Sequence, residues 1–286
     1  MSIVVTGATG QLGRLVVTSL LERGVPASDV LATGRDADRL AASVPEGVRT
    51  QRVDLDDPGT IDGALAAGDT VLLVSTDAVG RRVAQHTALI EAAVTAGVAR
   101  VVYTSAPHAD TSDLVLAPEH RATEEVLRAS GVPFTVLRNN WYTENYLPQV
   151  EQARATGALV ASAADGRVAS ATRRDFADAA AVVLSTEGHE GRTYELTGDT
   201  AWSFDDLAEV LGEITGRAVV YRPVDATEHQ RILVQAGLDE GTAAFVATLD
   251  ANIARGDLAD ATSDLRDLVG RPTTTLRDGL VEAVNA

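Results

Sequence analysis

The chain has 286 residues, of which 45% are hydrophobic, 23% charged and 4% aromatic; this is the composition of a globular protein with one large domain and a smaller lobe, not of a disordered chain. The formal net charge is −17, no cysteine occurs, and all 24 basic residues are arginine. An acidic chain without cysteine or lysine excludes general nucleic-acid binding, disulfides, thiolate catalysis, Cys-ligated zinc and Schiff-base chemistry.

Short apolar runs alternate with helical patterns through the first half of the chain. Strands are predicted at 3–6, 30–33, 48–53, 70–75, 100–105 and 134–137. The helices between them include 11–23, 81–96 and 119–130, and the last two end at glycines. Alternating strands and helices with short connections predict an α/β fold with a doubly wound parallel sheet.

The pattern changes after Asn139. Helices are expected at about 143–155, 174–186, 204–216, 225–237 and 240–254, a strand at 193–196 that rejoins the sheet, and a strand at 218–221 in the second lobe. We therefore predict a Rossmann domain at 1–138, rejoined by about 168–198, and a smaller, mainly helical substrate-binding lobe at 139–286. No apolar run approaches about 18 residues and no signal segment is visible, so we expect a cytoplasmic protein without membrane contact.

A glycine-rich turn joins the first predicted strand to the first helix. Its residues are Gly7, Ala8, Thr9, Gly10, Gln11, Leu12 and Gly13. Gly7 permits the sharp turn, Gly10 lets a diphosphate approach the backbone, and Gly13 lets the helix pack closely on the sheet. The free N–H groups and the dipole of the helix start favour an anion. The strand–turn–helix context favours a dinucleotide site over a plain turn.

Arg35 follows the second strand, where a dinucleotide-binding protein selects between its two coenzymes. A guanidinium at this place suits the 2′-phosphate of NADPH, and Arg39 lies one helical turn further on. Asp36 is the opposing signal for NADH, unless it turns away to cap a helix. Asp54, after the third strand, is interpreted either as an acceptor for the adenine amino group or as a turn residue. We predict NADPH in preference to NADH.

Many reductases with this type of turn use a Tyr-x-x-x-Lys pair for proton transfer, and the chain lacks it. Leu116 occupies the tyrosine position and His120 the lysine position. Alcohol–ketone interconversion is therefore disfavoured, whereas hydride transfer to a quinone or a cationic dye needs little proton assistance. His120 is interpreted as a structural residue or as a contact for a ribose hydroxyl. The five histidines show no metal-ligand spacing, so no metal is expected.

Three aromatic residues, Trp141, Tyr142 and Tyr146, lie together after the sixth strand. Flat rings suit a planar nicotinamide or quinone, and neighbouring Asn side chains suit the carboxamide; a small aromatic core beneath the second lobe is the alternative. His108, after the fifth strand, faces the same edge of the sheet.

Several motifs together resemble the NmrA-like branch of the atypical short-chain dehydrogenases, within it the bacterial NADPH:quinone oxidoreductases, with triphenylmethane reductases nearby. They are GATGQLGR at 7–14, Thr104-Ser105, the segments HADTS at 108–112, LRNNWYTENY at 137–146 and SATRRDF at 170–176, and GRPTTT at 270–275. The resemblance implies hydride transfer without flavin or metal. It also implies cofactor contacts from Gly7 to Gly13 and from Arg35, Ser75, Thr76, Asp77, Asn139, Asn140, Trp141, Tyr142, Thr143, Glu144 and Arg173.

From their places after the fifth and sixth strands, His108, Tyr142 and Asn145 are predicted to contact the acceptor, and no catalytic side chain is assigned. Asn140 departs from the pattern, because the related sequences have glycine there, and its side chain is expected to narrow the nicotinamide pocket. The favoured interpretation is an NADPH-dependent quinone reductase acting on a quinone or a similar planar electrophile. A non-catalytic NAD(P)-sensing regulator of the NmrA type and a reductase of triphenylmethane dyes are the alternatives, and the sequence leaves the oligomeric state open.

Overall fold

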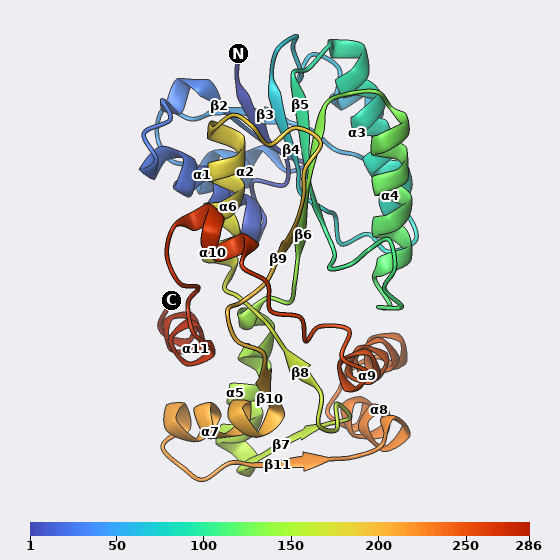
Figure 1. Ribbon diagram of the computed structural model, residues 1–286, viewed down its shortest axis with the longest axis vertical. Helices are drawn as coiled ribbons and strands as arrows, with labels where there is room; N and C mark the ends of the chain where they lie inside the picture. The colour runs from blue at the N-terminus through green and yellow to red at the C-terminus, as the bar shows by residue number, and fades with distance from the viewer.

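A seven-stranded parallel sheet forms the larger part of the molecule in the computed structural model, which describes residues 1–286 (Figure 1). Its strands lie in the order β3 (Arg49–Arg52), β2 (Val30–Gly34), β1 (Ile3–Val5), β4 (Thr70–Leu73), β5 (Arg100–Ser105), β6 (Phe134–Asn139) and β9 (Thr193–Leu196). Every neighbouring pair is parallel. The central strands β2 and β5 are buried along their length because both of their faces are covered. The predicted doubly wound α/β fold is confirmed.

Helices cover both faces of the sheet (Figure 1). On one face lie α1 (Gln11–Glu22), α2 (Ala37–Ser43) and α6 (Arg173–Ser185), and on the other lie α3 (Arg82–Ala96) and α4 (Ala117–Ala129). Two short 3-10 turns, η1 (Ala27–Asp29) and η2 (Pro58–Thr60), lie in the connections. The chain order reverses between β1 and β4, so the segments that leave these two strands lead to helices on opposite faces of the sheet; ligands of such sheets bind in the crevice between these segments.

A second lobe lies beyond the carboxyl ends of the strands, in the lower half of Figure 1. It contains η3 (Thr143–Tyr146), α5 (Leu147–Thr156), β7 (Ala158–Ala161), β8 (Arg167–Val168), β10 (Trp202–Ser203), α7 (Phe204–Thr215), β11 (Val220–Pro223), α8 (Ala226–Gln235) and α9 (Glu240–Ala254). Strand β7 pairs in parallel with β11, and β8 pairs antiparallel with β10. The chain ends with α10 (Asp264–Val269), which packs on α6, and α11 (Leu276–Asn285), which packs on η3.

The segments that cross between the sheet and the second lobe are hydrogen-bonded to one another. The backbone N–H of Ala169 donates to the carbonyl of Leu258 at 2.8 Å, and the N–H of Gly198 donates to the carbonyl of Ala169 at 2.9 Å. The N–H of Ala171 likewise donates to the carbonyl of Trp141 at 3.2 Å. Residues far apart in the sequence therefore form one connected layer between the two parts.

Most of the predicted elements are present, with small shifts at their ends. The expected return of 193–196 to the sheet is confirmed by β9, which lies beside β6. The strand predicted at 218–221 instead covers Val220–Pro223, and the helix predicted from 143 begins as the 3-10 turn η3. Strands β7, β8 and β10 and helices α10 and α11 were not predicted. The domain boundary at 138 stays a prediction, and no helix is both long and apolar enough to cross a membrane.

Candidate functional site

The predicted glycine-rich turn lies at the carboxyl end of β1, in the middle of the sheet. Gly7 has a φ of +60°, a left-handed conformation that glycine adopts without strain. The N–H of Gly10 donates to the carbonyl of Gly7 at 2.8 Å, which closes the turn. A Cβ atom on Gly13 would lie 2.8 Å from the carbonyl carbon of Gly7 and 3.0 Å from the Cα of Ala8, so only glycine fits between α1 and the turn.

The start of α1 is open to an anion. Gly10 caps the helix without any side-chain hydrogen bond, so the first N–H groups of α1 have no capping partner. At the start of α2, by contrast, the Asp36 carboxylate accepts a hydrogen bond from the N–H of Arg39 at 3.0 Å. The helix-cap interpretation of Asp36 is thereby confirmed. Arg35, beside it, is exposed and forms no ion pair, so its guanidinium is available to a ligand phosphate.

The segment after β4 brings Ser75, Thr76 and Asp77 to the same edge of the sheet. The Ser75 N–H donates to Thr104 Oγ1 at 2.9 Å, whereas the Ser75 hydroxyl is buried and has no hydrogen-bond partner. The Thr76 N–H donates to His86 Nε2 at 3.2 Å. A buried hydroxyl without a partner costs free energy, so the Ser75 hydroxyl, beside the glycine-rich turn, is a candidate contact for a ligand.

Two buried histidines stand behind this segment, between α3 and α4. Burial lowers the pKa of His86 to about 3 and that of His120 to about 3, with a smaller effect of nearby Arg82, so both rings are neutral at neutral pH. His120 Nδ1 lies 2.8 Å from the Tyr103 hydroxyl. The burial of the ring and its bond to Tyr103 favour the structural interpretation of His120, while the contact with a ribose hydroxyl stays a prediction.

A polar cluster follows β6 and meets the start of α6. The Asn139 Nδ2 donates to the Tyr142 hydroxyl at 3.4 Å, while the Asn139 Oδ1 is buried without a partner. The Arg173 guanidinium lies 4.5 Å above the Tyr142 ring and donates to Asn145 Oδ1 at 2.7 Å. The Arg173 N–H donates to the Glu144 carboxylate at 2.9 Å. The structure thus brings these sequence-predicted residues together.

Asn140 is buried, and its side chain bonds to the backbone of the crossing layer. Its Nδ2 donates to the Leu258 carbonyl at 3.2 Å, and its Oδ1 accepts from the Trp141 N–H at 2.7 Å. Both polar groups are therefore satisfied within the protein. The expectation that this side chain narrows the nicotinamide pocket remains a prediction. In the structure the side chain links the end of β6 to the backbone at Leu258.

The aromatic segment does not form one stack. Tyr142 packs edge-on against Phe176 at a centroid distance of 5.3 Å, whereas Tyr146 packs against Trp202 at 4.9 Å in the core of the second lobe. Trp141 is half-buried against the same core. The alternative of a small aromatic core therefore holds for Tyr146, and Tyr142 alone stays with the polar cluster.

His108 lies at the β9 side of the sheet, away from the glycine-rich turn. Its Nε2 is 3.0 Å from Asp260 Oδ2 and its Nδ1 is 3.4 Å from Glu195 Oε1. Its φ of +46° is held by the backbone N–H, which donates to Glu195 Oε2 at 3.1 Å. The structure ties this ring to the β9 edge and to the loop before α10, while the predicted contact with the acceptor stays a prediction.

A buried ion network beneath the carboxyl edge was missed by the sequence reasoning. Arg138 donates to both oxygens of Glu124, at 2.9 and 2.7 Å, and to Glu195 at 2.8 Å. The Glu124 side chain is 0% exposed and also accepts from the Ser105 hydroxyl at 2.7 Å. Although burial opposes it, the bonds from Arg138 and Ser105 lower the pKa of Glu124. The available signal was an arginine directly after the predicted strand 134–137, which lies inside β6 in the structure.

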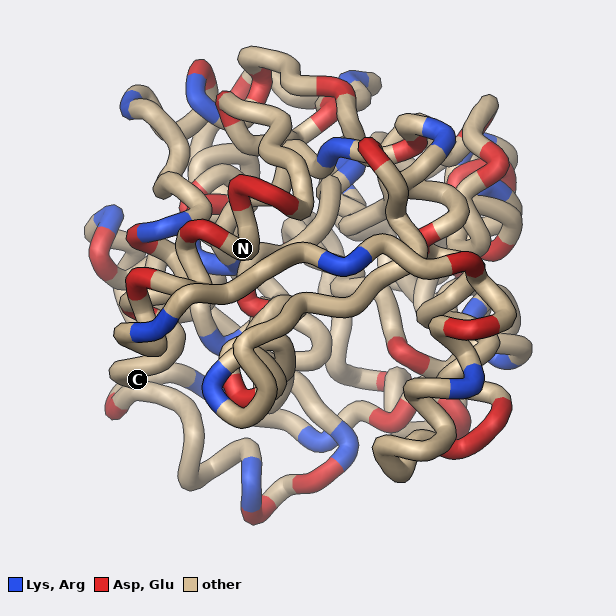
Figure 2. Tube along the Cα trace, turned by 90° about the horizontal axis from the view of Figure 1, so that it is seen from below, with Lys and Arg blue, Asp and Glu red and all other residues tan.

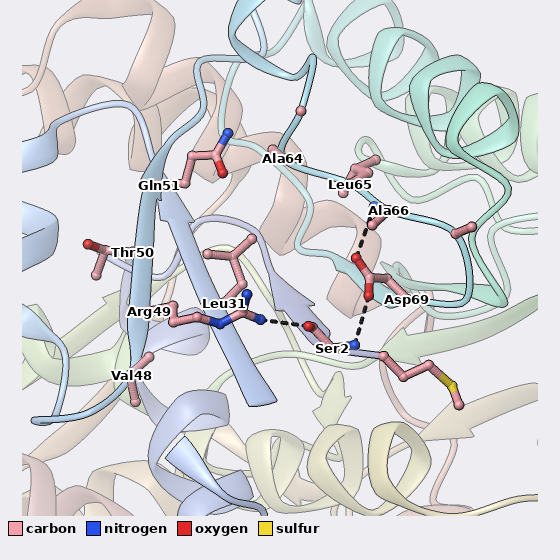
Figure 3. Close-up of a pocket in the computed structure, with 13 residues that line it drawn as sticks. Ser2, Leu31, Val48, Arg49, Thr50, Gln51, Ala64, Leu65, Ala66 and Asp69 are labelled. Carbon is pink, nitrogen blue, oxygen red and sulfur yellow. Dashed lines mark hydrogen bonds between the residues drawn. The ribbon is translucent and has the colours of Figure 1, made fainter. Parts of the chain in front are cut away.

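A hollow of about 700 Å³ lies at the opposite, amino edge of the sheet (Figure 3). Arg49 Nη2 donates to Ser2 Oγ at 2.6 Å, and the Ser2 and Ala66 N–H groups donate to Asp69 at 2.7 and 3.0 Å. The Arg49, Ser2 and Asp69 groups are paired with one another, and no buried polar side-chain atom without a partner lines this hollow, in contrast to the carboxyl edge.

Charge is spread over the surface. Figure 2 views the molecule from below and shows arginines interspersed with aspartates and glutamates, without a broad basic face. No group of three or more metal-binding side chains is present. Attraction of an anionic ligand must therefore come from local features, namely the start of α1 and Arg35.

This fold and this site define a class of protein: the chain belongs to the NAD(P)H-binding family, whose sequence profile matches residues 7–187. It is 42% identical to quinone oxidoreductase 2 of Escherichia coli (strain K12) over 99% of both chains. The crystal structure of the E. coli NADPH-dependent quinone oxidoreductase with NADPH superposes with a TM-score of 0.93 at 42% identity, covering 99% of this chain and 100% of that one.

Two further relatives place the chain within the family. Citrobacter sp. triphenylmethane reductase has a structure with a TM-score of 0.94 at 36% identity, covering 100% of both chains. An NmrA-like family domain-containing oxidoreductase from Aspergillus flavus is 30% identical, covering 98% of this chain and 94% of that protein. The predicted membership of the NmrA-like branch is therefore confirmed.

Proposed function

We propose that this protein is an NADPH-dependent reductase that transfers a hydride directly from the nicotinamide to a quinone, without flavin or metal, in the cytoplasm. The observation that carries the proposal is the set of unsatisfied groups at one sheet edge: the uncapped start of α1, the Ser75 hydroxyl and the Asn139 Oδ1. The similarity to an E. coli quinone oxidoreductase supports the same reaction class.

The residues of this chain fit the two ends of the coenzyme. The turn from Gly7 to Gly13 would hold the diphosphate on backbone N–H groups, and exposed Arg35 would hold the 2′-phosphate. Ser75 and Asn139 would bond to the nicotinamide half, each through a buried oxygen that has no partner within the protein. NADPH, when bound, supplies a hydride, so that quinone, NADPH and one proton give hydroquinone and NADP⁺.

The proton chemistry of the site limits the acceptor. Leu116 is apolar, His120 is neutral and buried, and burial raises the pKa of Tyr142, so that its phenol keeps its proton. A quinone suits such a site because the anion of a hydroquinone is stable enough to take its proton from solvent. An ordinary ketone needs a positioned acid as the hydride arrives, and none is supplied.

A reductase of triphenylmethane dyes is the second candidate, and the Citrobacter sp. relative, which matches over the full length, favours it. A cationic dye accepts a hydride without any proton, which agrees with the same lack of an acid. A sensor that binds the coenzyme without turnover uses the same binding residues but consumes no NADPH.

The deciding experiment follows the near-ultraviolet absorbance of NADPH with the purified protein and a panel of simple quinones, triphenylmethane dyes and azo dyes. We expect NADPH to be consumed fastest with quinones, and faster than with NADH at equal concentration. Binding of NADPH without consumption above the rate in buffer would favour the sensor. Absence of binding would overturn the cofactor assignment as well as the reaction.

A further inference from the structure

The start of α6 forms one wall of the candidate site through its first residue, Arg173. The Arg173 N–H donates to both oxygens of Glu144, at 2.9 and 3.1 Å, which fixes the helix start against η3. The guanidinium of Arg173 bonds to Asn145 and covers the Tyr142 ring. The position of the start of α6 therefore determines the position of Arg173, and the contacts of Arg173 hold the side chains of Tyr142 and Asn145.

Two residues further along α6, Asp175 connects this wall to the end of the chain. Its carboxylate is 0% exposed and accepts from Arg271 Nη1 at 2.6 Å, from the Thr274 N–H at 3.0 Å and from the Thr274 hydroxyl at 3.2 Å. Residues 270–275, between α10 and α11, are named here the C-terminal strap. Arg271 also donates to Asp178 at 2.8 Å, so the strap holds the first two turns of α6.

Helix α11, which follows the strap, packs against the same place. A Cβ atom on Gly279 would lie 2.7 Å from Thr172 Cγ2 and 3.2 Å from Thr143 Cγ2. Thr172 caps α6 and Thr143 begins η3, so there is no free space between α11 and these two elements. The strap and α11 together therefore define the spacing between α6 and the site turn.

The helix start does not need the strap in order to form. Thr172 caps α6 by accepting from the Asp175 N–H at 3.1 Å, and its hydroxyl donates to Asp175 Oδ2 at 2.8 Å. A fully buried carboxylate nevertheless needs a paired charge, and Arg271 supplies it from 96 residues away. Local residues are therefore sufficient to form the start of α6, and the ion pair with Arg271 fixes where that start lies relative to the strap.

We infer that Asp175 and Arg271 are positioning residues, which hold Arg173 and through it the nicotinamide side of the site. The inference rests on the proposed function, which places Asn139 on that side; Asn139 donates to the Tyr142 hydroxyl at 3.4 Å, and Tyr142 lies beneath the Arg173 guanidinium. The turn from Gly7 to Gly13 has no bond to the strap. The link between them passes through Asp178, which accepts from Ser19 at 2.8 Å, in the second half of α1 and away from the turn. The strap should therefore affect the nicotinamide half of the coenzyme and leave the adenosine half unchanged.

The test compares two ligands, NADPH and adenosine 2′,5′-bisphosphate, which lacks the nicotinamide half. We expect Arg271→Ala to weaken NADPH binding roughly tenfold, the loss of about one charge-assisted hydrogen bond, with bisphosphate binding unchanged within about twofold. Arg271→Lys keeps the charge and should recover part of the NADPH affinity. Arg266→Ala is the matched control, because Arg266 lies on α10 and its closest carboxylate is 3.9 Å away.

Equal weakening of both ligands, or of neither, would overturn the positioning role, since a merely structural change does not separate the two halves. If Arg271→Ala fails to fold, Arg271→Lys and Asp175→Asn give the same comparison. Wild-type protein that binds NADPH but reduces no quinone would refute the proposed reaction. The positioning role would then be decided by the affinities for NADPH and for adenosine 2′,5′-bisphosphate alone. Wild-type protein that binds no NADPH would overturn both.

Discussion

Replacing Gly13 with alanine should damage the coenzyme site while leaving the rest of the fold in place. The added Cβ would lie 2.8 Å from the carbonyl carbon of Gly7 and 3.0 Å from the Cα of Ala8. Both neighbours are backbone atoms of the glycine-rich turn, so neither can rotate away. Either α1 must move off the sheet, or the turn must move towards the space that a diphosphate would occupy.

The size of the effect follows from this contact. An extra methyl group forced against rigid neighbours costs about 1–3 kcal/mol, here at the junction of α1 with the core formed by Val5, Val16 and Leu20. Movement of the turn would transfer this free energy to ligand binding, where about 1–3 kcal/mol corresponds to about 5–150-fold in the dissociation constant. We therefore expect NADPH binding to weaken by at least about fivefold, together with a lower melting temperature.

The assay is titration of the protein with NADPH, followed by the nucleotide fluorescence, beside a thermal melt of each variant. Gly241→Ala is the control, because Gly241 also lies in the first turn of a helix, α9, where its Cβ would lie 3.3 Å from the movable Asp239 carboxylate. Alanine there should leave NADPH affinity unchanged and the stability equal or slightly higher. Unchanged affinity and stability in Gly13→Ala would refute the close-approach reasoning.

Three further outcomes are expected. Arg35→Ala should weaken NADPH binding about 10–100-fold, the loss of a charge-assisted contact, and leave NADH binding within about twofold in the same titration. Burial lowers the pKa of His86 and of His120 from 6.5 to about 3, so between these pH values the unfolded state binds more protons than the folded state. The contribution of these two histidines to the free energy of unfolding is therefore complete above pH 6.5 and decreases on acidification. We expect a decrease of about 1.4 kcal/mol per pH unit for each histidine, measured by urea unfolding. Arg138→Ala should destabilise the protein by about 3–5 kcal/mol in the same unfolding assay, since it leaves the Glu124 carboxylate buried without its main partner.

Each of these outcomes has a matched control. Arg49→Ala removes an exposed arginine at the opposite edge of the sheet and should not change the affinity for NADPH. His120→Gln should make the acid slope shallower, and an unchanged slope would contradict its assignment to the buried rings. Arg128→Ala removes a half-exposed partner of Glu124, at 2.6 Å, and should cost far less than Arg138→Ala; equal costs would contradict the role of burial.

Local patterns were sufficient to predict the sheet and the glycine-rich turn. The strand predicted at 100–105 matches β5, and the one predicted at 70–75 matches β4 except that β4 ends at Leu73. Both strands are almost entirely buried, so neither shows the alternation of polar and apolar residues that a half-exposed strand has. Strands β8 and β10 were not predicted, because each has two residues and depends on a partner from another part of the chain. Their stability comes from tertiary contacts rather than from propensity.

The candidate site was predicted in part, for the same reason. Residues that follow a strand, such as Ser75 and Asn139, could be assigned to one edge because parallel strands align their ends. The pairing of Asp175 with Arg271 spans 96 residues, and no local pattern indicates it. The direction of His108 towards Glu195 likewise depends on β9 being the neighbour of β6, which follows from topology rather than from the residues around His108.

The connected layer between the sheet and the second lobe limits how this molecule can open. Ala169 is bonded on either side, to Leu258 and to Gly198, and Asn140 adds a side-chain bond to the same carbonyl of Leu258. A wide hinge movement between the sheet and the second lobe would break these hydrogen bonds at the same time, because the crossing segments are bonded to one another. Entry and exit of ligands should therefore proceed by small sliding displacements, so that free and occupied forms differ little in radius of gyration.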